Sequence, residues 1–234
     1  QTTAFSRSEG GVLSYVGRLN YSYANKYLAE FLIRSDASTK FAPENYWGVF
    51  PSLSVGWIIS EEPWFKKNVK FIDFMKIRGS YGLLGRDNVK AWAWAQFYGS
   101  ETVKGPIFGT DPNANAGPHF QVPSAVPNRD SHWDKSYKSN LGLDLAFLNN
   151  RLSATLDGYY DRNREVFMAI TDAPDYPSTV GAVASASNYG SIDNYGIEIS
   201  LGWRDKIGKD FKYYVKLNTG YTDNKILMAP WKDA

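Results

Sequence analysis

Apolar and polar residues alternate over residues 133–162, and this alternation predicts a β-hairpin. From Tyr137 to Phe147 the odd-numbered positions are mostly apolar or aromatic, and the even-numbered positions are mostly polar or small. A period of two places these sets on opposite faces of a strand. The pattern resumes at Leu152, after a turn at 148–151 in which two asparagines tolerate left-handed backbone. Each arm has about ten residues, which is enough for a tilted strand to cross a bilayer.

The same alternation recurs along the chain and predicts about eight long strands. No segment has a convincing helical period, although Phe65 to Met75 has room for one helical turn. Long strands that follow one another in this way predict an all-β chain with antiparallel neighbours. The alternating segments are 12–23, 27–34, 52–59, 75–83, 137–147, 152–160, 197–204 and 213–221.

The connections between the predicted strands alternate between short and long. In an antiparallel sheet the short turns would therefore all lie at one end of the strands, and the long loops would lie at the other end. That arrangement is typical of bacterial outer-membrane barrels, whereas loops of this length are hard to place in a compact soluble domain. The shorter connections are 24–26, 61–73, 148–151 and 205–210, and the longer ones are 37–47, 87–133 and 164–190.

The predicted polar face carries charged residues that have two interpretations. Residues such as Arg78, Asp144 and Glu198 would line a watery lumen in a large membrane barrel. In a soluble sandwich the same residues would form the solvated outer face. Aromatic residues at the strand ends match the interfacial girdles of membrane proteins, but aromatic residues also favour strands in general. They are Tyr21, Tyr23, Tyr27, Trp57, Tyr159, Tyr160, Trp203 and Tyr213.

Composition narrows the classes of function. The chain of 234 residues is 43% hydrophobic with a net charge of +2, and this near balance argues against a nucleic-acid partner. It has no cysteine, which excludes disulfides and thiol chemistry. No apolar run is long enough for a transmembrane helix. A membrane barrel stays possible, because its strands give only a weak hydropathy signal.

Five segments of the chain resemble SusC/RagA-type TonB-dependent outer-membrane transporters. The longest, Asp36 to Trp57, is similar to the family pattern DGSSRFGPNNRWGxFPSxSxGW, with Ala37 and Ala42 where the family often has glycine. The other four follow in family order, although Asp193 to Tyr195 stands where a basic residue is common. They are KIRGSYG at 76–82, WDKSY at 133–137, FLNNRL at 147–152 and NYGSIDNYGIEI at 188–199.

The resemblance implies an outer-membrane β-barrel of a Gram-negative bacterium, with about 22 strands. It also implies an N-terminal plug, contact with the TonB complex through that N-terminal region, and a SusD-like surface lipoprotein as a lid. We expect residues 1–234 to be one partial barrel domain, without the plug and the final strands. The implied function is import of a glycan or oligopeptide across the outer membrane, in contact with its lipid, without a catalytic residue, metal or cofactor.

The two longest loops hold the candidate residues for contact with substrate or with the lipoprotein. Trp92, Trp94 and Tyr98 would form a platform that stacks on a sugar ring or a partner surface. Alternatively, Trp92 and Trp94 extend a strand and pack on its neighbour, or they belong to an aromatic girdle. His119 lies in the same loop, where no spacing matches a zinc site. Tyr176 lies in the loop 164–190, which either contacts the lipoprotein or is a plain surface loop.

Two other functions compete with transport. One is a small structural or adhesive outer-membrane barrel of eight strands, which would require the first and last strands to pair around a filled interior. The other is a soluble carbohydrate-binding β-sandwich that uses Trp92 and Trp94. Pairing of the outermost strands would distinguish the small barrel from part of a larger barrel wall, and the sandwich should be soluble without detergent.

Overall fold

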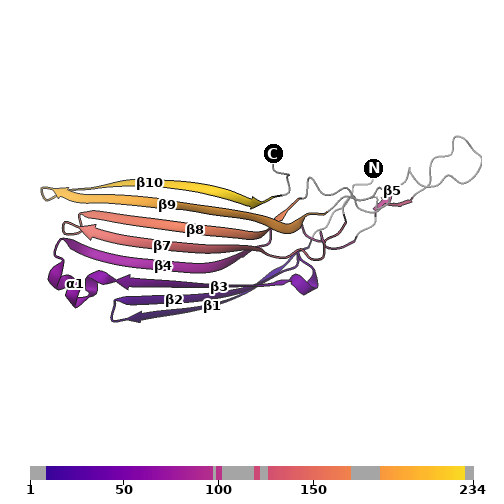
Figure 1. Ribbon diagram of the computed structural model, residues 1–234, viewed down its shortest axis with the longest axis horizontal. Coiled ribbons are helices and arrows are strands. Elements are labelled where there is room, and N and C mark those ends of the chain that lie inside the picture. Colours follow the sequence, from indigo (N-terminus) through magenta and orange to yellow (C-terminus); the bar gives the residue numbers. More distant parts are fainter. Residues whose placement is uncertain (1–8, 97–98, 102–118, 122–125, 170–184, 230–234) are drawn as a thin grey trace, which may run out of the picture.

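The computed structural model contains one antiparallel sheet of eight strands in the order β1-β2-β3-β4-β7-β8-β9-β10 (Figure 1). It describes residues 9–96, 99–101, 119–121, 126–169 and 185–229. Apart from β4 and β7, strands that are neighbours in the sheet are also consecutive in the chain, as in a meander. The strands are β1 (Val12–Tyr23), β2 (Tyr27–Ser38), β3 (Trp47–Ile58), β4 (Ile72–Arg86), β7 (Asp134–Phe147), β8 (Leu152–Met168), β9 (Ser187–Ile207) and β10 (Phe211–Met228).

Shorter elements lie in the connections. The helix expected within 65–75 begins earlier, because α1 covers Pro63–Asn68 and β4 already starts at Ile72. Two strands that the sequence did not predict, β5 (Gly99–Glu101) and β6 (His119–Gln121), pair within the long 87–133 loop. The 3₁₀ turns are η1 (Pro43–Asn45) and η2 (Ile59–Glu61). Among the residues described, no helix has the length and hydropathy that a membrane crossing needs.

Short turns and long connections are separated at the two ends of the sheet, as predicted. Figure 1 shows α1 and the tight turns at one end and the long connections at the other. The turns use left-handed backbone at Asn149 (φ 58), Asn150 (φ 60) and Gly208 (φ 65). These residue types adopt that conformation more readily than branched side chains. We call these two sides the turn end and the loop end.

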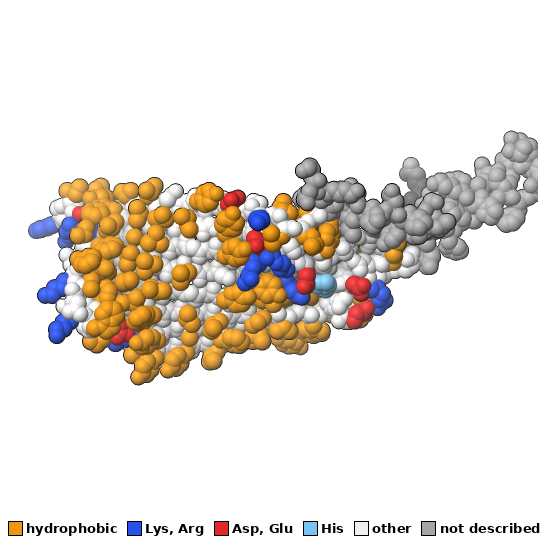
Figure 2. Space-filling view, viewed as in Figure 1, with side chains coloured by type: hydrophobic (Ala, Val, Ile, Leu, Met, Phe, Trp, Pro, Cys, Tyr) orange, Lys and Arg blue, Asp and Glu red, His pale blue; other side chains and the backbone are white. Residues whose placement is uncertain are grey.

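The pairing register gives the sheet one apolar face and one polar face. Trp57, Ile77, Leu143, Leu156 and Ile199 follow one another across five strands on the apolar face. Figure 2 shows hydrophobic side chains spread over the strands on this side, with most charged side chains towards the two strand ends. The row that carries Arg78 lies on the other face and passes through Gly56, Gly142, Asp157 and Glu198. The predicted division of each strand into two faces is confirmed.

The two outermost strands of the sheet, β1 and β10, are not paired with each other. Within the described part of the chain β1 pairs only with β2, and β10 pairs only with β9. A closed barrel of eight strands is therefore not formed. A sandwich is not formed either, because these residues contain no second large sheet. Both competing folds are wrong for this sheet.

A cluster of buried hydrophobic side chains lies at the loop end, where β3 and β4 separate. Their pairing stops at Ser52 and Gly82, while β4 continues to pair with β7 as far as Arg86 and Asp134. Aromatic rings fill the gap between the diverging strands, and the ring of Phe50 lies against Gly85, where a side chain would collide with it. The cluster consists of Phe41, Phe50, Val89 and Trp133. It forms the base on which the loops rest.

Candidate functional site

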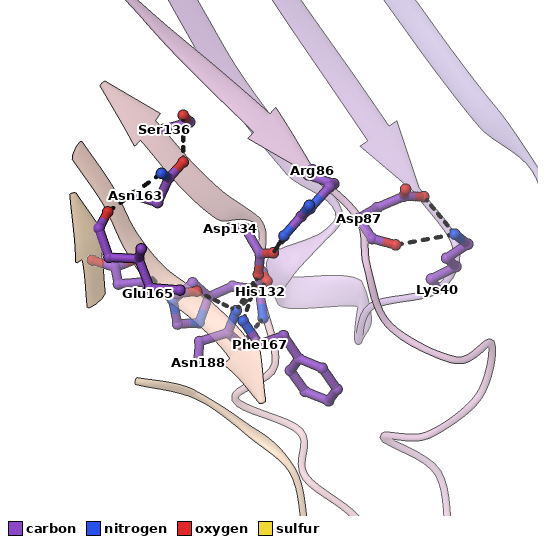
Figure 3. Close-up of polar contacts among 11 residues, drawn as sticks. Lys40, Arg86, Asp87, His132, Asp134, Ser136, Asn163, Glu165, Phe167 and Asn188 are labelled. Carbon is purple, nitrogen blue, oxygen red and sulfur yellow. Dashed lines mark hydrogen bonds and ion pairs between the residues drawn. The ribbon is translucent and has the colours of Figure 1, made fainter. Parts of the chain in front are cut away.

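Asn188, near the start of β9, connects three strands at the loop end (Figure 3). Its partners lie just before β7, at the start of β7 and near the end of β8. Its side-chain nitrogen donates to the carbonyl oxygens of His132 (2.8 Å) and Glu165 (2.9 Å) and to Asp134 Oδ1 (3.3 Å). Its side-chain oxygen accepts from the His132 backbone nitrogen at 3.0 Å. We call Asn188, His132, Asp134 and Glu165 the Asn188 clasp. Because it links β7, β8 and β9, the clasp determines where the loops leave the sheet.

A bulge in β8 brings Glu165 into the clasp. The pairing between β8 and β9 shifts between Asn163 and Val166, and Glu165 has a φ of 53. Its carboxylate contacts Lys135 Nζ at 2.7 Å and His132 Nε2 at 2.9 Å. Left-handed backbone at a non-glycine residue is unfavourable unless surrounding contacts hold it. These contacts explain why the strand departs from its regular ladder here.

Asp134 is the buried carboxylate of the clasp, with 5% of its surface exposed. It accepts from the Phe167 backbone nitrogen at 2.8 Å and forms an ion pair with Arg86 Nη2 at 3.1 Å. A buried carboxylate without such partners would be strongly unfavourable. Asp134 therefore requires the neighbouring segments in their observed positions.

A second polar contact ties the β2–β3 connection to the segment after β4. Lys40 Nζ lies 3.1 Å from Asp87 Oδ2 and donates to the Asp87 carbonyl at 3.0 Å. The Ser38 hydroxyl also donates to Asp87 Oδ2, at 3.0 Å. Figure 3 shows Lys40 and Asp87 on the far side of Arg86 from the clasp. The Asn188 clasp and the Lys40–Asp87 pair thus lie on opposite sides of Arg86 at the loop end of the sheet.

A cavity of about 660 Å³ lies among these loop segments. Its size falls in the range of small-molecule pockets, and its wall mixes apolar side chains with a few polar ones, as such pockets do. The lining includes Lys40, Val89, Ala93, Asn128, Phe167 and Ala186. The cavity is large enough to hold part of a ligand.

Trp92 and Trp94 lie close together beyond the end of β4. Their ring centroids are 5.8 Å apart, and 41% of Trp92 is exposed. The expectation that they extend a strand is wrong, because they lie in turns and Trp92 has a φ of 64. The Arg129 guanidinium covers the Trp94 ring at 5.3 Å from its centroid, a cation–π distance. Trp92 therefore offers the more accessible ring of the pair.

Arg129 reaches Trp94 from a position held by Glu44. Its Nε and Nη2 donate to the two carboxylate oxygens at 3.0 and 3.1 Å. Hydrogen bonds from the backbone of Glu44 itself and from Arg129 lower the pKa of the Glu44 carboxyl from its ordinary value. A two-point pair of this kind orients the guanidinium plane, so Glu44 positions the charge over the indole.

The structure does not describe the side chains of the remaining predicted contact residues. Tyr98 and Tyr176 lie outside the described residues. His119 pairs through its backbone with Glu101 in the ladder of β5 and β6, and nothing is described of its side chain. Among the described residues, no three His, Asp or Glu side chains are grouped so that they could hold a metal ion. Of the predicted contact residues, Trp92 and Trp94 are therefore the two whose side chains the structure describes.

The polar face has its own charged network, centred on Arg78. Its Nη2 pairs with Asp157 at 2.7 Å and its Nε with Asp144 at 3.1 Å. Tyr159 lies on this face too and donates to Thr222 Oγ1 at 2.7 Å. Its assignment to an interfacial girdle is therefore wrong, whereas Tyr27 and Trp57 do stack on the apolar face, with centroids 6.4 Å apart.

Sequence reasoning did not find the Asn188 clasp. Two of its members, Asp134 and Asn188, lie in segments that carry the family resemblance, and this was the available signal. Glu165 lay in a predicted loop, so nothing in the alternation pointed to a bulge. The role of Glu44 was also missed, because its partner Arg129 is 85 positions away in the chain.

Comparisons with known proteins agree with this architecture. A family model described as "TonB dependent receptor-like, beta-barrel" matches residues 2–233. The chain is 32% identical over 232 residues to the TonB-dependent receptor SusC of Bacteroides thetaiotaomicron, a match that covers 97% of the chain and 22% of SusC. It is 27% identical over 226 residues to the TonB-dependent receptor P39 of Formosa agariphila, with 97% of the chain and 20% of P39 covered.

A solved structure gives the same fold. The RagAB peptide importer in its "open-open" state superposes with a TM-score of 0.79 at 24% identity, covering 95% of this chain and 22% of that one. The chain thus spans about a fifth of the length of the curated relatives that it matches.

Proposed function

Because this chain belongs to the TonB-dependent receptor β-barrel family, we propose that it supplies neighbouring wall strands of a nutrient importer in a bacterial outer membrane. In this proposal residues 1–234 are one part of a larger barrel domain, and the plug and further strands belong to the rest of the receptor. The observation that carries it is a sheet with one apolar face, one charged face and two open edges. A wall between lipid and a watery lumen needs all three.

The apolar face supports the proposal physically. Large hydrophobic side chains such as Leu19, Val55 and Leu141 are more than half exposed on it. Water would disfavour so large a continuous apolar surface, whereas lipid accommodates it. Unpaired backbone groups at the edges of β1 and β10 would be costly inside a bilayer. Further strands of the same barrel would satisfy them.

In a transporter, the Arg78 network, the Asn188 clasp and the cavity each have a role. The Arg78 network keeps the lumen side polar, and the clasp and cavity at the loop end position the loops that receive a ligand. Substrate passes without covalent chemistry, so no catalytic residue is needed. The energy for import comes through TonB acting on the plug in the rest of the receptor.

The SusC and RagAB relationships support two further parts of the proposal. The partner is a SusD-like surface lipoprotein that covers the loop end. The substrate is a glycan or an oligopeptide, since one solved relative is a peptide importer. Trp92 is our candidate contact residue. It lies against Trp94, whose ring is covered by Arg129. The exposed Trp92 ring could stack on a sugar or pack against a partner surface.

An uptake assay in cells tests the function. Cells that lack the intact receptor should lose import of either labelled oligosaccharides or labelled oligopeptides, and the intact gene should restore it. The receptor should co-purify with a surface lipoprotein. Unchanged import of both substrate classes in the deleted strain would contradict the proposal.

The orientation of the sheet is tested by labelling single cysteines in this naturally cysteine-free chain. A membrane-impermeant maleimide should label Glu44→Cys at the loop end of intact cells. It should label Asn149→Cys, at the turn end, only after the cells are broken. Labelling of position 149 but not 44 in intact cells would reverse the topology.

A further inference from the structure

The apolar face ends at the loop end in a row of tyrosines followed by charged residues. Tyr81, Tyr160 and Tyr195 lie in one row of the register. The next row towards the loops contains Arg162 and Lys225 on either side of Asp193. One row further, Lys135 pairs in register with Arg164. Figure 2 shows a group of Lys and Arg side chains at this end of the hydrophobic surface.

The carboxylates near these cations are already engaged. Asp193 is only 6% exposed, and its two oxygens accept from Arg164 Nη1 and from the Tyr160 hydroxyl, both at 2.5 Å. Glu165 lies 2.7 Å from Lys135 Nζ. A third carboxylate, Asp223, lies in the tyrosine row beside Lys225 and accepts from the hydroxyls of Tyr195 at 3.2 Å and Tyr221 at 3.5 Å. Four cations thus meet three carboxylates, which leaves an excess of one positive charge.

Arg162 and Lys225 carry that excess. Both side chains are exposed in the described chain, in which β10 is an outermost strand. Each lies opposite Asp193 in the register, but neither forms a hydrogen bond or a close ion pair with another described residue. Exposed cations at the edge of a hydrophobic face favour an anionic group at that depth of the membrane. Headgroup phosphates of the outer leaflet lie there, directly above the aromatic row that marks the interface.

We propose that Lys135, Arg162, Arg164 and Lys225 form a binding site for the phosphate groups of a phosphorylated glycolipid in the outer leaflet. Guanidinium groups bind phosphate oxygens in pairs, and lysines add positive charge. Basic clusters next to a membrane interface recognise anionic headgroups in the same way. The site rests on the proposed function, because it requires the apolar face to lie in an outer membrane.

The geometry also gives each residue a separate role. The contact with Asp193 fixes Arg164, and Glu165 fixes Lys135, so these two cations are held in place before a lipid arrives. Arg162 and Lys225 are free to close on the phosphate. We therefore expect their removal to weaken lipid binding while the local structure persists.

The test compares two double variants of the intact receptor. Arg162→Ala with Lys225→Ala removes the free cations of the site. The control, Lys212→Ala with Lys216→Ala, removes the same charge from the polar face of β10. Each receptor is reconstituted in nanodiscs that contain purified phosphorylated glycolipid, or the same glycolipid after enzymatic removal of its phosphates. Bound glycolipid per receptor is measured by mass spectrometry.

Wild-type receptor and the control should retain the phosphorylated glycolipid, and the site variant should bind it about ten-fold more weakly. Equal retention by the site variant, or equal retention of the dephosphorylated glycolipid, would overturn the proposal. Displacement by millimolar inorganic phosphate would also overturn it, because the site would then bind phosphate from any source.

Membrane fractionation separates this inference from the proposed function. If the wild-type receptor is absent from the outer membrane, the proposed function fails. If it is present and imports substrate but retains no phosphorylated glycolipid, only the lipid site fails.

Discussion

Arg78 Nη2 lies 2.7 Å from Asp157 Oδ2, and this ion pair reaches from β4 to β8 across the intervening strand β7. It can do so because Gly142 occupies the register position between them. A Cβ at position 142 would lie 2.5 Å from Arg78 Cζ. The charged network of the polar face therefore depends on the absence of one side chain.

Gly142→Ala should displace the Arg78 side chain and destabilise the intact barrel by about 1–3 kcal/mol, as overpacking does. The matched control is Gly158→Ala, because Gly158 has open space around its Cβ position. Denaturant unfolding of the two variants in detergent measures the difference. Equal stability of both variants would show that Arg78 adapts without loss.

Leu143→Arg should impair assembly of the receptor in the membrane by about 2–4 kcal/mol if the residue lies near the bilayer midplane. Its side chain belongs to the apolar face, between Ile77 and Leu156. Asp144→Asn, one position later and on the polar face, should assemble normally. Heat-modifiable mobility on gels reports folded barrel, and equal amounts from both variants would refute the assignment of faces.

Asn188→Ala should loosen the loop end without preventing barrel assembly. The substitution removes hydrogen bonds to His132 and to the Glu165 carbonyl, so these half-buried backbone groups lose their partners. Limited proteolysis of intact cells should cut the loops of this variant faster. Asn194→Ala, in the same strand, serves as the control, and equal cleavage of the two variants would argue against a role for the clasp.

Trp92→Ala should reduce import or lipoprotein retention by the intact receptor while leaving folded barrel unchanged. Trp64→Ala is the control, because Trp64 is 52% exposed in α1 at the opposite end of the sheet. Uptake and co-purification are measured for both. A loss shared by both variants, or seen only for Trp64→Ala, would remove Trp92 from the contact site.

Glu62 should make the stability of the turn end depend on pH. Hydrogen bonds from the Tyr27 hydroxyl and then from Trp57 Nε1 lower the pKa of its carboxyl from an ordinary value of 4.5. A lowered folded-state pKa contributes stability above the unfolded-state pKa, and this contribution disappears as the pH falls through the folded-state pKa. Thermal unfolding followed by tryptophan fluorescence should thus lose more stability between neutral and acidic pH in wild type than in Glu62→Gln.

Local pattern was sufficient to predict the strands and their two faces. The two faces of a strand meet different surroundings at neighbouring positions such as Leu143 and Asp144, so a period of two is visible in the sequence itself. The tight turn at 148–151 was predictable for a local reason as well, since Asn149 and Asn150 tolerate positive φ. Both predictions depend on residues that are close together in the chain.

Features that depend on distant partners were decided only by the tertiary structure. The bulge at Glu165 requires Lys135 and His132, and the turn at Trp92 lies where strand extension was expected. The position of Arg129 over Trp94 depends on Glu44, far away in the chain. The alternation along one strand carries no information about such partners, because pairing across loops of this length is set by packing and buried polar contacts.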